Sequence, residues 1–240
     1  MTINNYEWLK KLGVINMNNK QVKSKERVVN HGEVFTAERE VNAMLDLVKQ
    51  ETERIDSRFL EPACGDGNFL SEILKRKLAM VKNRYRRSPH DYEKYAVIAV
   101  SSIYGVDILH DNVKDCRERM FQIFDKRYGE NCKQSANDRC REAVKFILKR
   151  NILCGDALTL KDVNGKPIIF SEWSLVTGSM TKRRDFRLDQ LMEGHENKKQ
   201  LSLFQDESDW QFDKEVQAYI PAPIREFPLV NYWEVQNYGE

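Results

Sequence analysis

The sequence lacks the features that mark secreted, membrane-spanning and zinc-binding proteins. It contains no run of eighteen apolar residues and no signal-peptide pattern at its start, so we expect a soluble cytoplasmic protein with no membrane partner. Its cysteines are scattered, odd in number and free of any C-x-x-C pair, which predicts free thiols and no metal site. They are Cys64, Cys116, Cys132, Cys140 and Cys154.

A strong net charge is also missing. Charged residues make up 32% of the 240 residues, yet Lys and Arg nearly balance Asp and Glu, which leaves a formal charge of +2. No global field therefore marks the chain as a nucleic-acid binder, and contacts with a polyanion would depend on local patches. The length allows one large domain or two small ones.

The most informative stretch is residues 59–70, Phe-Leu-Glu-Pro-Ala-Cys-Gly-Asp-Gly-Asn-Phe-Leu. Its apolar run, its two glycines and the helical spacing that follows predict a strand, a tight loop and a helix. Gly65 and Gly67 let the backbone turn sharply and approach a ligand. An ordinary tight turn between a strand and a helix is the alternative, and the third glycine of the dinucleotide-binding fingerprint is absent.

Two further predicted strands end near acidic residues. Residues 104–108 read Tyr-Gly-Val-Asp-Ile, and residues 151–158 read Asn-Ile-Leu-Cys-Gly-Asp-Ala-Leu, with helical patterns between the strands. This alternation predicts an α/β fold and the first half of a doubly wound parallel sheet. In nucleotide-binding folds an acid at the end of the second strand accepts hydrogen bonds from ribose hydroxyls, a role that fits Asp107. A merely solvated acid is the alternative.

These stretches resemble motifs of the adenine-N6 DNA methyltransferases. Residues 59–70 resemble motif I, and Gly32 to Ala37 resemble motif X, with Thr36 also a candidate cap of the helix that follows. Asp107 resembles motif II, and the Gly-Asp-Ala-Leu of residues 155–158 resembles motif III. The order X, I, II, III is that of the γ-class, which includes the modification subunits of restriction–modification systems.

The resemblance implies a Rossmann-like S-adenosylmethionine-dependent methyltransferase fold. It also implies DNA as the partner and methyl transfer to N6 of adenine as the reaction. The residues that it places at the cofactor are Phe35, Thr36, Glu61, Pro62, Ala63, Gly65, Gly67, Asn68, Phe69, Asp107, Ile108, Asp156 and Ala157.

The catalytic motif of that family, Asn/Asp-Pro-Pro-Tyr/Phe, is absent between residue 157 and the end. Its polar groups accept from the target amine, and its aromatic ring stacks on the flipped base. The nearest substitute is Glu172 with Trp173. Three hypotheses follow: a methyltransferase with a divergent catalytic loop, a non-catalytic or split module whose partner supplies the motif, and an enzyme acting on a small molecule or protein. The missing motif disfavours the first, and the resemblance disfavours the third.

Composition predicts an N-terminal helical arm and linker (residues 1–32), a cofactor-binding domain (33–175) and a polar extension of unknown fold (176–240). In this fold the first strand, about residues 57–61, lies centrally, so the sheet is incomplete unless a fourth strand covers its edge. We expect residues 167–175 to provide that strand within a stable monomer. Self-association or a second subunit is the alternative.

Overall fold

The computed structural model describes residues 25–31, 36–196, 210–213 and 218–239. The chain divides into two compact units, Met1–Leu47 and Val48–Glu240. The domain boundaries expected from composition remain predictions.

In the first unit, the described helices are α2 (Lys25–His31) and α3 (Glu38–Leu47). Helix α3 confirms the predicted helix. Its first backbone bonds run from the amides of Glu40 and Val41 to the carbonyl of Ala37, so Ala37 and not Thr36 directly precedes it. Phe35 lies outside the described residues.

The second unit is built on a mixed α/β arrangement with a parallel sheet. Its strands are β1 (Phe59–Glu61), β2 (Ile103–Asp107), β3 (Ile152–Asp156) and β4 (Lys161–Asp162), in the spatial order β1-β2-β3-β4. The first three strands are parallel, and β4 is antiparallel to β3. The arrangement is compatible with a Rossmann-like fold, as the sequence predicts.

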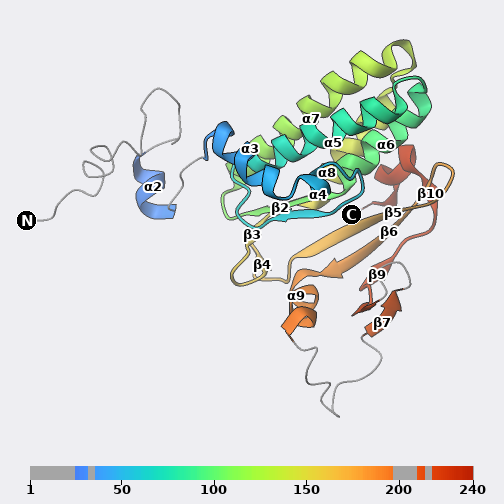
Figure 1. The fold of residues 1–240 in the computed structure, drawn as a ribbon. Coiled ribbons are helices and arrows are strands. Elements are labelled where there is room, and N and C mark those ends of the chain that lie inside the picture. Colours follow the sequence, from blue (N-terminus) through green and yellow to red (C-terminus); the bar gives the residue numbers. More distant parts are fainter. Residues whose placement is uncertain (1–24, 32–35, 197–209, 214–217, 240) are drawn as a thin grey trace, which may run out of the picture. The chain divides into compact units, whose positions relative to one another are not determined.

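Helices connect the parallel strands and lie on one side of the sheet (Figure 1). The connecting helices are α5 (Asn68–Tyr85), α6 (Pro89–Ser101), α7 (His110–Cys132) and α8 (Asp138–Asn151). Two short pieces, α4 (Lys49–Thr52) and η1 (Lys133–Ser135), precede β1 and α8. The apolar stripe predicted after the glycine loop is buried along α5.

The polar segment at residues 128–138 is partly helical. Helix α7 continues to Cys132 because Tyr128 and Cys132 are buried on its inner face. The side chain of Asn137 then accepts a hydrogen bond from the amide of Cys140 (2.8 Å), which caps the start of α8. The stretch is therefore polar on its outer face only.

A β-hairpin covers the other face of the sheet (Figure 1). Tyr104 and Val106 of β2 pack against Ile168 and Phe170 from the hairpin side. The ring centroids of Tyr104 and Phe170 are 5.3 Å apart, and the Tyr104 hydroxyl donates to the carbonyl of Ser171 (3.1 Å). Strand β2 is therefore buried on both faces, as a parallel strand normally is.

The hairpin does not extend the parallel sheet. Its strands, β5 (Ile169–Thr177) and β6 (Met180–Arg187), pair antiparallel with each other, and β6 also pairs with β9 and β10. The prediction that residues 167–175 lie beside β1 is wrong, although they do form a strand. Pairing across a tight turn closes a much shorter loop than pairing with β1 would, which favours the hairpin.

The remaining described elements follow the hairpin. They are α9 (Leu188–Glu196), β7 (Trp210–Asp213), β8 (Ala218–Pro221), β9 (Arg225–Glu226), β10 (Val230–Asn231) and η3 (Tyr232–Tyr238). The extension beyond residue 175 thus contains regular structure and is not only a polar tail.

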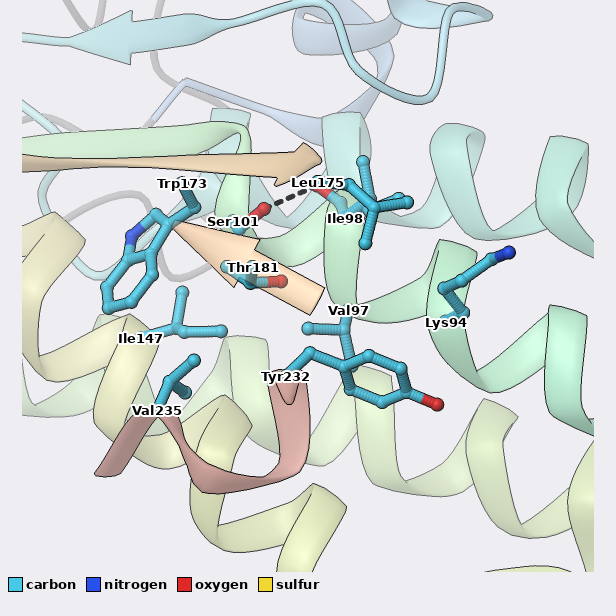
Figure 2. Close-up of a pocket in the computed structure, with 10 residues that line it drawn as sticks. All are labelled: Lys94, Val97, Ile98, Ser101, Ile147, Trp173, Leu175, Thr181, Tyr232 and Val235. Atoms are coloured by element: carbon cyan, nitrogen blue, oxygen red, sulfur yellow. Dashed lines mark hydrogen bonds between the residues drawn. The ribbon is translucent and has the colours of Figure 1, made fainter. Parts of the chain in front are cut away.

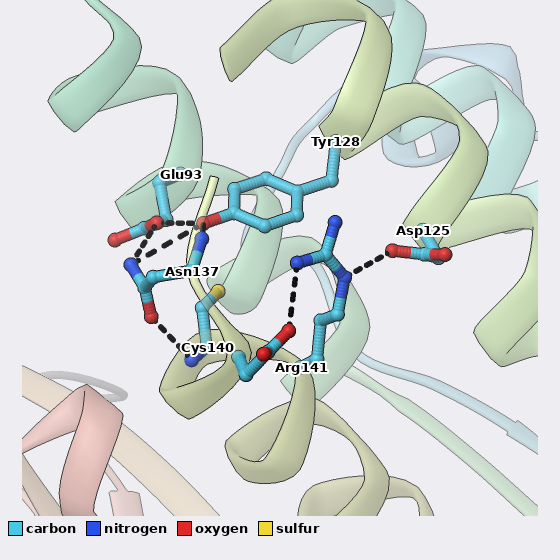
Figure 3. Close-up of polar contacts among 7 residues, drawn as sticks. Glu93, Asp125, Tyr128, Asn137, Cys140 and Arg141 are labelled. Carbon is cyan, nitrogen blue, oxygen red and sulfur yellow. Dashed lines mark hydrogen bonds and ion pairs between the residues drawn. The ribbon is translucent and has the colours of Figure 1, made fainter. Parts of the chain in front are cut away.

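The buried carboxylate of Glu93 on α6 anchors η3 to the helical layer. It accepts hydrogen bonds from the hydroxyl of Tyr128, Asn137 Nδ2 (3.1 Å), the hydroxyl of Tyr232 (2.8 Å) and Trp233 Nε1. Figure 3 shows Glu93 with the two partners from α7 and the start of α8. Burial and the bond to Glu93 both raise the pKa of Tyr232. These bonds give hydrogen-bond partners to a polar group whose burial would otherwise be costly.

Beside η3 the packing leaves only a small cavity (Figure 2). It is lined mainly by apolar side chains of α6, α8, the hairpin and η3, among them Val97, Ile147, Trp173 and Val235. Its volume is about 20 Å³, which has room for about one water molecule. This cavity is therefore a packing defect and not a ligand site.

Strand β1 is short, and the buried Lys77 bonds the segment that leads into it. The buried Lys77 donates to the carbonyls of Ile55 (3.1 Å) and Ser57 and to Ser102 Oγ (2.6 Å), and burial lowers the pKa of Lys77 to about 7. Among the described strands β1 pairs only with β2, and the side chain of Leu60 is 43% exposed. Within the described part of the chain no strand pairs with the outer edge of β1, which we call its open edge.

This open edge predicts unequal exchange of neighbouring amides. The amide of Phe59 donates to the carbonyl of Ser102 (3.0 Å), so the amide of Leu60, the next residue, points away from β2. In the intact protein we expect Leu60 to exchange its amide hydrogen much faster than Phe59, measured by NMR. Equal protection would show that something covers the edge, and protection that grows with protein concentration would identify self-association.

Candidate cofactor site at the carboxyl edge of the sheet

The carboxyl ends of the three parallel strands bring three acidic residues to one edge. Glu61 ends β1, Asp107 ends β2 and Asp156 ends β3. Asp107 is in register with Cys154, so Asp156 lies two residues further along the neighbouring strand. In open α/β sheets, ligands bind in the crevice outside these strand ends.

The glycine loop connects β1 to α5 as predicted. Gly65 and Gly67 both adopt left-handed conformations, with φ of 53° and 92°. The amide of Cys64 donates to the carbonyl of Val106 (2.9 Å), which joins the loop to β2. Helix α5 begins at Asn68, so its first backbone amides and the positive end of its dipole face the same edge.

Asp107 fastens this loop to the next helix. Its Oδ2 accepts from the amide of Gly65 (2.9 Å), and its Oδ1 accepts from the amide of Leu109 (2.8 Å) and from Asn112 Nδ2 (3.3 Å). The side chain is 9% exposed. A carboxylate has about four acceptor positions, so Asp107 can hold the loop and still accept from a ligand.

Asp156 lies at the surface and is held in its ionised form. Its Oδ1 accepts from the amide of Leu158 (2.8 Å) and its Oδ2 from the hydroxyl of Thr159 (3.1 Å). The bond from Leu158 is the main reason that the pKa of Asp156 lies below its usual value. Two apolar side chains flank the acids: Ile108 is 59% exposed and Leu158 is 95% exposed. Leu158 was not among the predicted site residues.

Arg119 is a second residue that sequence reasoning missed. From α7, its Nη1 donates to Asn68 Oδ1 (2.6 Å) and its Nη2 to Asp66 Oδ2 (2.5 Å), so it braces the start of α5. The other oxygen of Asp66 is buried and has no hydrogen-bond partner in the structure. The contact between Asp66 and Arg119 could not be predicted from local sequence patterns, because the two residues are 53 positions apart.

Most of the predicted cofactor residues lie together on this edge. The structure gathers Glu61, Pro62, Ala63, Gly65, Gly67, Asn68, Phe69, Asp107, Ile108, Asp156 and Ala157 on the three strand ends and the segments that follow them. Thr36 belongs to the other unit, and Phe35 lies outside the described residues.

Glu172 and Trp173, proposed from the sequence as a divergent catalytic loop, lie at the opposite end of the strands. Glu172 pairs with Arg58, the residue before β1, and Trp173 Nε1 donates to the side chain of Asn151, the residue before β3 (2.9 Å). Each is only 9% exposed. The hairpin places them at the amino ends of the parallel strands, so they cannot act at the carboxyl edge.

The reason for Gly67 also differs from the expectation of close approach to a ligand. A Cβ atom at Gly67 would lie 2.8 Å from Cys116 Sγ on α7, so the close neighbour is the protein itself. The positive φ of Gly67 adds a second requirement for glycine. The position is therefore constrained by loop geometry and helix packing.

Two other features are absent from the described ranges. No group of three or more His, Cys, Asp and Glu side chains there could hold a metal ion. The same ranges contain no helix with the length and apolar character needed to span a membrane.

Comparison with known proteins gives one informative similarity. No family model matches the chain, and no solved structure matches it. Over 126 residues, or 51% of this chain, it is 25% identical to "DNA methyltransferase A" of Bacillus subtilis (strain 168). The matched region covers only 14% of that relative's length. The chain therefore resembles a DNA methyltransferase over about half of its own length.

The geometry at Gly67 predicts a stability difference between two glycines. Gly67→Ala should lower the free energy of unfolding by about 1–3 kcal/mol, because alanine disfavours positive φ and its Cβ would meet Cys116. Gly129→Ala is the matched control, since a Cβ at this position inside α7 meets nothing within 4 Å. It should raise the free energy by about 0.5–1 kcal/mol. Urea unfolding measures both, and equal effects would contradict the assignment.

Proposed function

We propose that this protein binds S-adenosylmethionine at the carboxyl edge of β1, β2 and β3. We further propose that it is the cofactor-binding part of a cytoplasmic DNA methyltransferase acting on N6 of adenine, of the restriction–modification type. The observation that carries the proposal is the set of hydrogen bonds to Asp107, which joins the glycine loop to the start of α7. Asp156, whose pKa is lowered, ends the neighbouring strand.

The residues at the edge fit the chemistry of that cofactor. Asp107 retains acceptor capacity for ribose hydroxyls. Ile108 and Leu158 offer apolar surface to a flat base, and Asp156 can accept from an exocyclic amine. The start of α5 suits a carboxylate, and the unpaired oxygen of Asp66 suits an ammonium group. The cofactor supplies an activated methyl group, and the residues named here would bind and orient it.

A second candidate function follows from two groups that are missing from the described residues: catalytic residues at the carboxyl edge and a strand beside β1. Glu172 and Trp173 lie at the wrong end of the strands, and the outer edge of β1 has no strand partner within the described residues. Both observations favour a cofactor-binding module that needs a further polypeptide. That polypeptide would add a strand beside β1 and supply the Asn-Pro-Pro-Tyr motif.

Cofactor binding is tested with a matched pair of acids. Asp156 and Asp162 each accept from turn amides close by, and both have lowered pKa values, but only Asp156 ends a parallel strand. Asp156→Ala should weaken S-adenosylmethionine binding by about 1–3 kcal/mol, measured by titration calorimetry, and Asp162→Ala should not. Asp107→Ala should weaken it by a similar amount.

No binding by the intact protein at millimolar ligand would overturn the proposed function. Equal losses in the Asp156 and Asp162 variants would show that the site is not at this edge.

Catalysis by the chain alone should be negligible. We expect no transfer of tritium from labelled S-adenosylmethionine to mixed-sequence duplex DNA, because no described residue supplies the catalytic motif at the carboxyl edge. Robust transfer by the isolated protein would refute the module hypothesis. Inactivation of that transfer by Glu172→Ala would also refute the placement of Glu172 at the far end.

A further inference from the structure

A groove of about 250 Å³ runs between α7 and α8, outside the candidate cofactor site. Its polar lining is mostly basic: His110, Lys114 and Arg117 come from α7 and Lys145 from α8, with Glu118 as the acid. His110 is the first residue of α7 and follows Ile108 by two positions. The groove therefore begins at the carboxyl edge of the sheet.

The groove presents one arginine that the protein holds in place. Arg117 Nε donates to the carbonyl of Ile152 (2.9 Å), and its Nη2 donates to the carbonyl of Lys149 (3.1 Å). Burial lowers the pKa of Arg117, but a guanidinium stays charged at neutral pH. Its Nη1 has no partner among the described residues and is not a buried unsatisfied atom, so it is accessible for a further bond.

The two lysines of the groove are not neutralised by acids. No ion pair to Lys114 or Lys145 occurs within the described ranges, whereas Arg119 pairs with Asp66 and Arg141 with Asp125 on the same two helices. Lys145 instead lies with its Nζ 4.6 Å from the centre of the Phe121 ring. A local excess of positive charge thus survives in a chain whose overall charge is only +2.

We propose that the α7–α8 groove binds the sugar-phosphate backbone of DNA. The inference rests on the proposed function for the choice of DNA, and on charge complementarity for the site. Phosphodiesters are bound by Lys and Arg side chains, and a braced guanidinium is well suited to a phosphate oxygen. Contact here would hold a duplex beside the edge where the cofactor is proposed to bind, without reading its sequence.

The test measures how binding depends on salt. Anisotropy of a fluorescein-labelled duplex of 24 base pairs is titrated with the intact protein at several salt concentrations. Lys114→Gln combined with Lys145→Gln should reduce the slope of log affinity against log salt by about 0.9 for each phosphate that the variant no longer neutralises. Thermal unfolding of the variant should match the wild type, because glutamine keeps most of the lysine stem.

The matched control removes two lysines elsewhere on the helices. Lys82→Gln with Lys126→Gln changes the net charge equally, and neither residue lines the groove. An unchanged slope in the groove variant, or an equal change in the control, would overturn the proposal. Equal binding of the matching RNA duplex would overturn the choice of DNA.

Calorimetry with S-adenosylmethionine separates this proposal from the proposed function. The groove variant should bind the cofactor as the wild type does. DNA binding that depends on the groove lysines, without any cofactor binding, would support the DNA-binding groove and refute the cofactor site. Cofactor binding, together with DNA binding that the groove variant does not change, would support the cofactor site and refute the DNA-binding groove.

Discussion

The carboxylate of Asp107 is the constraint on which the candidate site depends. It accepts from the amide of Gly65 on one side and from the amide of Leu109 on the other, so one side chain fixes the glycine loop and the start of α7 together. The contact between Gly67 and Cys116 then sets how closely α7 packs on the loop. Loop, strand ends and helix start form one unit, because each of them uses a group supplied by another.

Local patterns in the sequence were sufficient to predict this unit. The glycine loop, the apolar stripe of α5 and the acids at the ends of β2 and β3 depend on residues close together in the chain, and all were predicted as elements. Leu158 lies within residues 155–158 but was not among the predicted site residues, and Arg119 was missed because its place depends on tertiary packing. Glu172 was misplaced for the same reason: its ion pair with Arg58 spans 114 residues. Residue type and spacing alone cannot show to which end of a sheet a later strand returns.

The hairpin shows how a strand pattern can be correct while its pairing is wrong. The segment at residues 169–177 has apolar residues suited to a buried strand, and it is one. It pairs with β6 along one edge, and its Phe170 side chain packs against Tyr104 and Val106 of β2. The buried Arg183 pairs with Asp185 and donates a hydrogen bond to Ser171. One residue of the basic run at positions 182–184 is therefore buried within the hairpin. That run is consequently weaker evidence for a DNA contact than the groove between α7 and α8.

The open edge of β1 and the basic groove are two separate surfaces, because the order of the strands in the sheet keeps them apart. A strand added at the outer edge of β1 would extend the sheet away from β2, whereas Arg117 in the groove bonds the carbonyl of Ile152, the first residue of β3. Since β2 lies between β1 and β3, a partner at the edge leaves the groove accessible. The glycine loop follows β1 directly, so the same partner strand would end beside the proposed cofactor. Under the two proposals, this chain would hold the cofactor and the phosphate backbone, and a second polypeptide would supply the catalytic groups.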